Sequence, residues 1–226
     1  MDKRNTEITV QAGRINLKGN LVVPDNAKAI VIFSHGSGSS RFSPRNNYVA
    51  AVLNKNNIAT LLIDLLTPVE DEIYANRFNI DLLTTRLITV TRHIHQQPQF
   101  QNFSIGYFGA STGAASALRA ASTMSDVIDA VVSRGGRPDL AASAIPSIDA
   151  PTLLIIGSID EPVIEMNQEA YDLMKCEKKM VIVHGATHLF EEPGKLEEVA
   201  KLATDWFQKF LLKSNSPKLK HSHHDV

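Results

Sequence analysis

Short apolar runs alternate along the chain with longer segments that have one apolar face. Runs that are apolar throughout predict strands buried on both faces of a sheet. We expect such strands at residues 29–35, 59–65, 103–109, 127–135, 151–158 and 178–185. Two runs with more polar positions, residues 6–11 and 14–23, predict an opening pair of strands joined as a hairpin at Gly13.

The intervening segments predict helices, because their apolar residues recur at the helical period. These helices are expected at residues 44–56, 80–97, 112–122, 162–174 and 195–211. Residues 137–144 are expected to form a short helix or a loop, and residues 65–79 a polar, acidic loop. The alternation predicts an α/β fold, with a doubly wound, mostly parallel sheet of about eight strands, helices on both faces and no large cap domain. We expect one domain over residues 1–212 and a polar, disordered tail over residues 213–226.

Composition and charge argue against a nucleic-acid-binding, membrane or secreted protein. The chain has 226 residues, of which 43% are hydrophobic and 21% charged, and its formal net charge is −1. Such a balance provides no general attraction to nucleic acid or to an anionic membrane. The opening MDKRNTEITV is too polar for a signal peptide, and no apolar run approaches membrane-spanning length. With a single cysteine, Cys176, which cannot form an intrachain disulfide, these features predict a soluble, cytoplasmic protein.

Three histidines in the tail, His221, His223 and His224, are the one candidate for a metal site. A solvated tail or an artificial extension explains them better. The sequence holds no CxxC, HExxH or phosphate-binding G-x-x-x-x-G-K pattern. We therefore expect neither a metal nor a cofactor.

The stretch IGYFGASTGAAS, residues 105–116, places a serine between two glycines where a strand is expected to meet a helix. In an open α/β sheet the active site lies outside the carboxyl ends of the strands. Gly109, Ser111 and Gly113 in this position are typical of a nucleophile elbow, a sharp turn that exposes a strained serine. The alternative is a glycine-rich turn that happens to contain a serine, and the pattern by itself does not decide.

Two backbone amides are candidates for an oxyanion hole. The amide of Thr112 opens the helix after Ser111, and a helix N-terminus favours negative charge. The loop HGSGSSR begins at His35 after a strand, and it could bring the amide of Ser37 opposite that of Thr112. The alternative is a glycine-serine loop whose histidine only caps the strand.

An acid follows the strand at residues 151–158. Asp160 could orient an imidazole and stabilise its charged form, although an aspartate before a proline is also a favoured helix cap. We favour Asp160 over its neighbour Glu161, and Asp139 is a weaker alternative.

A base follows the last expected strand. His188 lies in the loop HGATHLFEEPG, from which it could swing toward Ser111 as a general base. His184 stands at the end of the strand itself, where a structural hydrogen bond suits it better. The chain order serine, aspartate, histidine is the order of the α/β-hydrolase fold. A serine hydroxyl needs such a base, and the base such an acid, to act as a nucleophile near neutral pH.

With these motifs the sequence resembles the α/β-hydrolase superfamily, and within it the dienelactone hydrolase-like group, over about residues 16–212. The most specific matches are SHGSGSSR, GYFGASTGAA, SRGGRPDL, IIGSIDEPVIEMN and HGATHLFEEPG. The resemblance implies a catalytic triad of Ser111, Asp160 and His188, with the amides of Ser37 and Thr112 as oxyanion hole. Dienelactone hydrolases proper carry cysteine at the elbow, whereas this chain carries serine. That difference argues against dienelactone as substrate and leaves ester hydrolysis intact.

His35, Arg134 and Arg137, at strand ends, are candidates for substrate binding, and so is Arg41, which with Arg45 follows the loop of Ser37. Guanidinium groups beside a pocket suit a carboxylate or phosphate on the substrate. The alternative, which we favour for the arginines, is salt bridging to loop acids such as Asp64, Glu191 and Glu192.

These features predict a serine hydrolase that cleaves small carboxylic esters, with lactones and thioesters as further candidates, through an acyl-enzyme. Its expected partner is a small-molecule ester, without nucleic acid or membrane, and it is expected to be a monomer or homodimer. Acyl transfer to an alcohol or amine uses the same first half-reaction and stays open. A non-catalytic ligand-binding protein of the same fold is the other alternative, since fold does not dictate function.

Overall fold

The computed structural model describes residues 4–212 of the chain. The predicted disordered tail and its three histidines lie outside these residues. Eight strands form one sheet, as the sequence predicts, and their order is β1-β2-β4-β3-β5-β6-β7-β8. The bounds are β1 (Arg4–Ala12), β2 (Ile15–Val23), β3 (Ala29–Ser34), β4 (Ala59–Ile63), β5 (Ser104–Ala110), β6 (Ile128–Arg134), β7 (Thr152–Gly157) and β8 (Lys178–Val183).

The sheet is antiparallel only at one edge. Strands β1 and β2 form the expected hairpin at Gly13, and β2 also runs antiparallel to β4. From β4 to β8 every neighbouring pair is parallel. The carboxyl ends of these parallel strands therefore meet along one edge of the sheet, where the candidate residues follow them.

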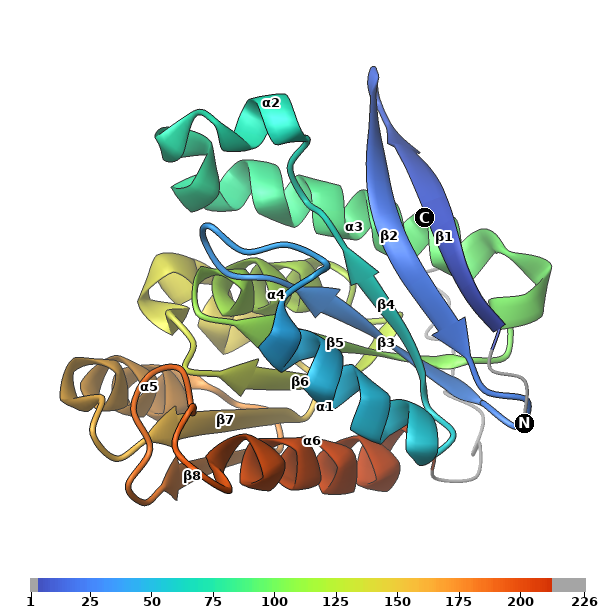
Figure 1. The fold of residues 1–226 in the computed structure, drawn as a ribbon. Coiled ribbons are helices and arrows are strands. Elements are labelled where there is room, and N and C mark those ends of the chain that lie inside the picture. Colours follow the sequence, from blue (N-terminus) through green and yellow to red (C-terminus); the bar gives the residue numbers. More distant parts are fainter. Residues whose placement is uncertain (1–3, 213–226) are drawn as a thin grey trace, which may run out of the picture.

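Helices cover both faces of the sheet (Figure 1). One face packs against α1 (Pro44–Lys55) and α6 (Lys195–Leu211), whose buried side chains include Leu53, Trp206 and Phe207. The other face packs against α3 (Ile80–Gln96), α4 (Thr112–Thr123), α5 (Glu161–Leu173) and the 3-10 segment η3 (Pro138–Ser147). This two-sided covering explains why β3, β4 and β7 are buried at every position, as their continuous apolar sequences predict.

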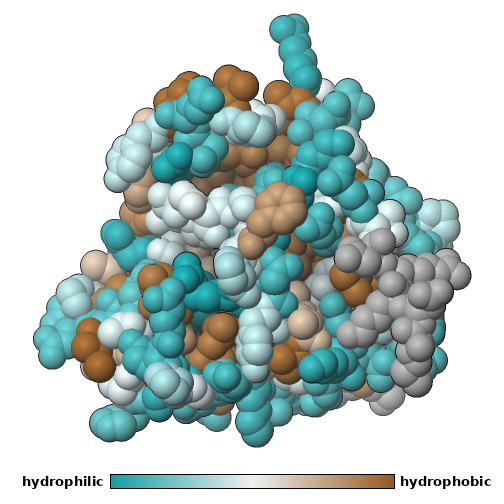
Figure 2. Space-filling view, in the orientation of Figure 1, coloured by the Kyte–Doolittle hydropathy of each residue, from teal (hydrophilic) through white to brown (hydrophobic). Residues whose placement is uncertain are grey.

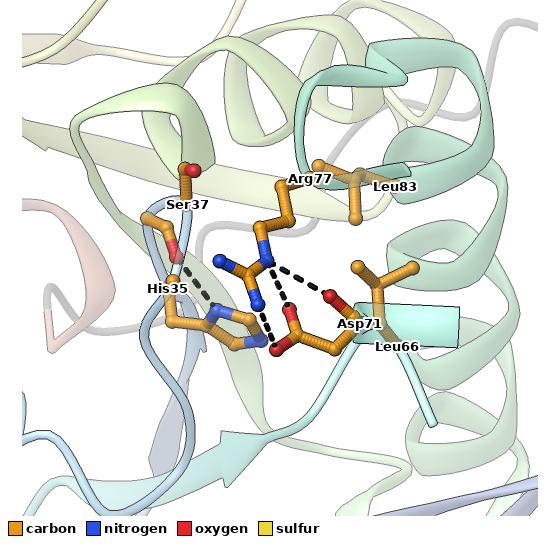
Figure 3. Close-up of a pocket in the computed structure, with 8 residues that line it drawn as sticks. His35, Ser37, Leu66, Asp71, Arg77 and Leu83 are labelled. Carbon is orange, nitrogen blue, oxygen red and sulfur yellow. Dashed lines mark hydrogen bonds and ion pairs between the residues drawn. The ribbon is translucent and has the colours of Figure 1, made fainter. Parts of the chain in front are cut away.

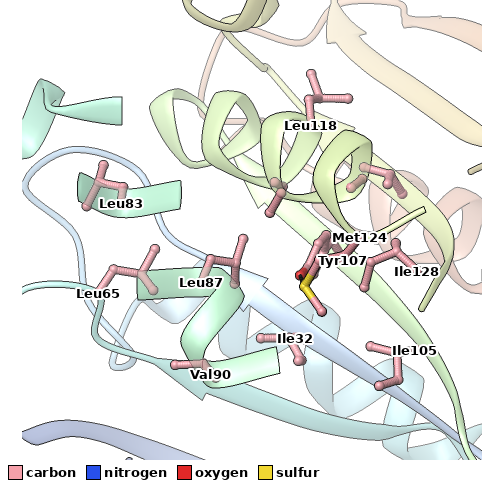
Figure 4. Packing of buried hydrophobic residues seen from close by; sticks show 14 of the residues in the cluster. Ile32, Leu65, Leu83, Leu87, Val90, Ile105, Tyr107, Leu118, Met124 and Ile128 are labelled. Carbon is pink, nitrogen blue, oxygen red and sulfur yellow. Dashed lines mark hydrogen bonds between the residues drawn. The ribbon is translucent and has the colours of Figure 1, made fainter. Parts of the chain in front are cut away.

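The larger hydrophobic cluster lies between the sheet and α3 and α4 (Figure 4). Leu83, Leu87 and Val90 of α3 belong to the same cluster as Ile32 and Ile105 of the sheet. The fully buried phenol of Tyr107 is satisfied internally, because its hydroxyl hydrogen-bonds the Thr91 hydroxyl at 2.6 Å. Burial raises the pKa of Tyr107, so the phenol stays neutral there.

Residues 65–79 differ from the expected loop, because they contain α2 (Pro68–Asp71) and η1 (Tyr74–Phe78). The helix α2 begins with a capping box: the Thr67 hydroxyl accepts from Glu70 N, and the Glu70 carboxylate accepts from Thr67 N. Figure 2 shows hydrophobic side chains at the end of the molecule where Figure 1 places α2. The exposed apolar residues of the segment are Val69, Ile73, Tyr74 and Phe78. No helix within residues 4–212 has the length and apolar character needed to cross a membrane.

Candidate active site

Ser111 stands at the sharp turn between β5 and α4, and its backbone is strained. It has φ 52° and ψ −123°, a positive φ that a non-glycine residue rarely adopts. Two backbone hydrogen bonds hold the turn: Ser111 N donates to Arg134 O at 3.1 Å, and Arg137 N donates to Ser111 O at 3.1 Å. The elbow geometry predicted from the G-x-S-x-G pattern is therefore present.

The two glycines of that pattern allow backbone segments to pass close together. A Cβ at Gly109 would lie 2.5 Å from Ala114 Cα, and one at Gly113 would collide with the carbonyl oxygens of Ser34 and His35. Strand β5, helix α4 and the loop after β3 can approach one another at Ser111 only because these side chains are missing.

Three side chains from separate strand ends form a hydrogen-bonded chain at this turn. His188 Nδ1 lies 2.6 Å from Asp160 Oδ2, and His188 Nε2 lies 3.3 Å from Ser111 Oγ. In the sequence His188 lies 28 positions after Asp160 and 77 positions after Ser111. Asp160 is largely shielded, whereas His188 is about one-third exposed. The arrangement can fix one imidazole tautomer and leave Nε2 free to accept the serine proton.

The alternative residues have other surroundings. Asp160 is the N-cap residue of α5, yet its side chain makes no capping hydrogen bond and contacts His188 instead. Glu161 is an exposed residue of the first turn of α5. The Asp139 carboxylate accepts both bonds of the Arg137 fork, at 2.9 and 2.7 Å. His184 is exposed, directly after β8.

The loop that carries His188 is fixed from both sides. Thr187 donates its amide and its hydroxyl to the Glu192 carboxylate, and these bonds lower the pKa of Glu192. Gly135, in the left-handed region with φ 51°, passes so close that a Cβ there would lie 3.3 Å from the His188 ring. Glu192 thus braces the loop and is not an arginine partner.

The two backbone amides expected for an oxyanion hole differ in their partners. Thr112 N begins α4 and has no acceptor among residues 4–212. Ser37 N does lie opposite Thr112, but it donates to the Thr112 hydroxyl at 2.8 Å. The sequence analysis missed this side chain, since nothing in the local pattern marks the hydroxyl of the residue after the nucleophile.

His35 is committed to holding the loop after β3. Its Nε2 accepts from Leu65 N at 3.2 Å, which leaves Nδ1 to donate to Gly36 O at 3.0 Å. Burial lowers the pKa of His35, consistent with a neutral ring of this one tautomer. Both ring nitrogens are occupied within the protein, so the structure favours the strand-capping interpretation over substrate contact.

Three of the arginines near the site are paired with acids. Arg41 donates to Asp64 at 2.6 Å and to Glu7 at 3.1 Å. Arg137 forms its fork with Asp139, which raises the pKa of Arg137. Arg45 of α1 pairs with Glu191 at 2.6 Å. For Arg41 and Arg137 these pairs favour salt bridging over substrate binding.

Arg134 is the exception. It is 6% exposed, its Nε has no hydrogen-bond partner, and its guanidinium makes no ion pair with any acid of residues 4–212. The ring of Phe190 lies 5.8 Å from the guanidinium carbon. Burial, with the nearby positive charge of Arg45, lowers the pKa of Arg134 to about 10, so the group is still charged at neutral pH. An unpaired buried charge is costly, and it is a common mark of a binding site.

A small pocket opens beside the loop after β3 (Figure 3). Its empty volume is about 190 Å³, and His35, Ser37 and Gly38 line one side of it. Leu66, Leu83 and the ion pair of Asp71 with Arg77 line the other side. Gly36 in this loop approaches the elbow closely, since a Cβ there would lie 3.2 Å from Ser111 Cβ. No group of three or more potential metal ligands comes together within residues 4–212.

Comparison with known proteins gives one family. The family model of the dienelactone hydrolase family matches residues 50–212. Proteins from two Mycobacterium tuberculosis strains, both called "Putative phosphoribosyl transferase", are 54% identical over 204 residues. That match covers 90% of this chain and 46% of theirs, so the chain spans about half the length of these relatives.

Solved structures of other proteins share the fold of this chain. A dienelactone hydrolase from Anabaena variabilis is 52% identical, with a TM-score of 0.90 over 92% of this chain and 99% of that one. Est1E from Butyrivibrio proteoclasticus is 17% identical, with a TM-score of 0.76 over 90% of this chain and 98% of its own. The second likeness concerns the fold alone.

Proposed function

The chain belongs to the dienelactone hydrolase family, and on that premise we propose that it is a serine hydrolase that cleaves small carboxylic esters through an acyl-enzyme. Family membership supports a hydrolase. The observation that carries the finer proposal is the hydrogen-bonded chain from Asp160 through His188 to Ser111.

In the proposed reaction Ser111 Oγ attacks the ester carbonyl carbon while His188 Nε2 takes the serine proton. The carbonyl electrons move onto oxygen, and the tetrahedral intermediate then collapses and expels the alcohol, which receives that proton from His188. A water molecule then attacks the acyl carbonyl carbon while His188 Nε2 takes a proton from the water. The second tetrahedral intermediate expels Ser111 Oγ, which receives that proton from His188, and the carboxylic acid is released. Asp160 holds His188 Nδ1–H throughout and stabilises the charged imidazolium.

The name of the Mycobacterium relatives indicates a different reaction, phosphoribosyl transfer. Those proteins are about twice as long as the part that this chain matches. A serine with a histidine and an aspartate serves acyl transfer. We therefore base the proposed activity on the residues of this chain and do not extend the relatives' name to it.

Esters with short acyl chains, of roughly two to six carbons, are expected to be the best substrates. The pocket beside Ser37 has an empty volume of about 190 Å³, part of which is open solvent, so it encloses little space for an acyl chain. Ile73 and Tyr74, which could have lined a tunnel, are 56% and 70% exposed. The gain of about 0.8 kcal/mol per buried methylene should therefore stop after a few carbons.

A series of p-nitrophenyl esters from acetate to palmitate tests both the activity and the chain length. We expect kcat/KM to peak among the short esters and to fall afterwards. A value that still rises beyond decanoate would show a buried acyl tunnel, and no turnover of any ester would contradict the proposed hydrolase.

We further propose that Arg134 receives an anionic group of the substrate. Ala110 of β5 is paired with Arg134 of β6. The Arg134 side chain therefore starts from the strand next to the one that leads into Ser111. The side chain lies against Phe190, two residues after His188, and close to Arg45. A carboxylate there would supply the anion that the protein does not provide.

Arg134→Gln is expected to lower kcat/KM for mono-p-nitrophenyl succinate about 10- to 100-fold, because a charged hydrogen bond contributes about 1.5–3 kcal/mol. The loss on neutral p-nitrophenyl butyrate should stay within about threefold. Arg137→Gln, which breaks a pair with Asp139, is the control and should affect both esters alike. Equal losses on both esters in Arg134→Gln would indicate a structural role instead.

A further inference from the structure

The Thr112 hydroxyl accepts the hydrogen bond that the Ser37 amide was expected to donate to the oxyanion. Ser37 N–H points at Thr112 Oγ1, with 2.8 Å between nitrogen and oxygen. Thr112 is 3% exposed whereas Ser37 is exposed, so this bond is part-buried. The Ser37 amide is thus already satisfied by the protein.

Hydrogen bonds and close backbone packing hold the loop that carries Ser37 in place. His35 holds its start through both ring nitrogens, and a turn closes it with Ser39 N donating to Gly36 O at 3.1 Å. Gly36 itself rests against the elbow, since a Cβ there would lie 3.1 Å from Ala110 O. These contacts favour a Ser37 amide that remains on Thr112 during the reaction.

A threonine hydroxyl can accept two hydrogen bonds and donate one. Thr112 Oγ1 accepts from Ser37 N, and its own proton has no acceptor within residues 4–212. The side chain is branched at Cβ, which restricts its rotamers, and the bond from Ser37 N holds Oγ1 in place. Thr112 directly follows Ser111, and its backbone N–H is likewise without an acceptor in the described part of the chain. One residue therefore offers two unused donors next to the nucleophile.

We propose that the Thr112 hydroxyl is the second donor of the oxyanion hole, beside the Thr112 amide. Ser37 is then a positioning residue, whose amide orients the hydroxyl and polarises it by a cooperative hydrogen bond. The hydroxyl keeps its proton throughout. It donates to the oxygen that becomes negative when Ser111 Oγ bonds to the carbonyl carbon, and the serine proton still moves to His188 Nε2. This inference rests on the proposed function, because it requires Ser111 as the nucleophile.

Thr112→Val removes the hydroxyl at nearly constant volume, and Thr112→Ser retains it. On p-nitrophenyl acetate we expect Thr112→Val to lower kcat by about 100- to 1,000-fold, the range for a lost oxyanion donor, with KM changed less than about threefold. Thr112→Ser should recover most of that loss. Thr123→Val, at the exposed far end of α4, is the matched control and should leave kcat within about twofold.

Two results would overturn the inference. A kcat of Thr112→Val within threefold of the parent would show that the hydroxyl is no donor. A higher kcat would show that it competes with the oxyanion for the Ser37 amide. Either result leaves the proposed function standing as long as the parent hydrolyses the ester, whereas an inactive parent contradicts the proposed function itself.

A crystal structure of the parent protein carrying a methylphosphonate on Ser111 tests the same point without any variant. We expect the phosphoryl oxygen within about 2.5–3.0 Å of Thr112 Oγ1, the range of O–H···O bonds, with Ser37 N still on Oγ1. A Ser37 amide turned onto the phosphoryl oxygen, with Oγ1 left out, would refute the inference even if Thr112→Val failed to fold.

Discussion

Ser111→Ala is expected to lower kcat/KM for p-nitrophenyl acetate by about three to six orders of magnitude. The variant has no nucleophile to form an acyl-enzyme, and only binding and the oxyanion donors remain. The fold should persist, because the change removes one oxygen at a partly exposed turn and leaves the backbone bonds to Arg134 and Arg137 in place.

Ser122→Ala is the matched control for this loss. Ser122 lies near the end of α4, the helix that follows Ser111, and its hydroxyl donates to the Arg119 carbonyl. Its kcat/KM should match that of the parent. If Ser111→Ala retained more than about a tenth of the activity, the nucleophile would have to be sought elsewhere.

Asp160→Asn is expected to cost on the order of 10⁴ in turnover while the fold is retained. An asparagine amide can donate to His188 Nδ1, which places the imidazole proton on Nε2 and leaves no base facing Ser111. Steady-state kinetics on the same ester, with circular dichroism as a check of folding, measures the effect.

Glu161→Gln removes an equal charge one residue away and serves as control. The Glu161 side chain is exposed and belongs to the first turn of α5, so its loss should change turnover by no more than a few-fold. If Glu161→Gln caused the severe loss of turnover and Asp160→Asn only a mild one, the acid of the triad would be Glu161 and not Asp160.

Most of the fold is predictable from the sequence, because buried parallel strands demand continuous apolar runs. The runs AIVIF and ATLLI correspond to β3 and β4, and the amphipathic residues 195–211 match α6 in full. The segment 65–79 was missed, since it lacks a long apolar stripe. Its signal is local: Thr67 at the N-cap and Glu70 three positions later, within the helix, form the capping box of α2.

The candidate site is predictable only as far as backbone topology determines it. Strand ends bring Ser111, Asp160 and His188 to one edge, so their proximity follows from the order of the strands. The partners of long side chains do not follow in this way. Arg41 reaches Asp64 and Arg137 reaches Asp139, while Arg134 is left without an acid, and these differences depend on side-chain packing.

Labelling with a fluorophosphonate, followed by mass spectrometry of the tryptic peptides, tests the central proposal most directly. The reagent bonds covalently to an activated serine, so one label per chain is expected, on Ser111 within the peptide of residues 93–119. The label should be absent from Ser111→Ala. A label on another residue, or equal labelling of Ser111→Ala and the parent, would contradict Ser111 as the nucleophile of this hydrolase.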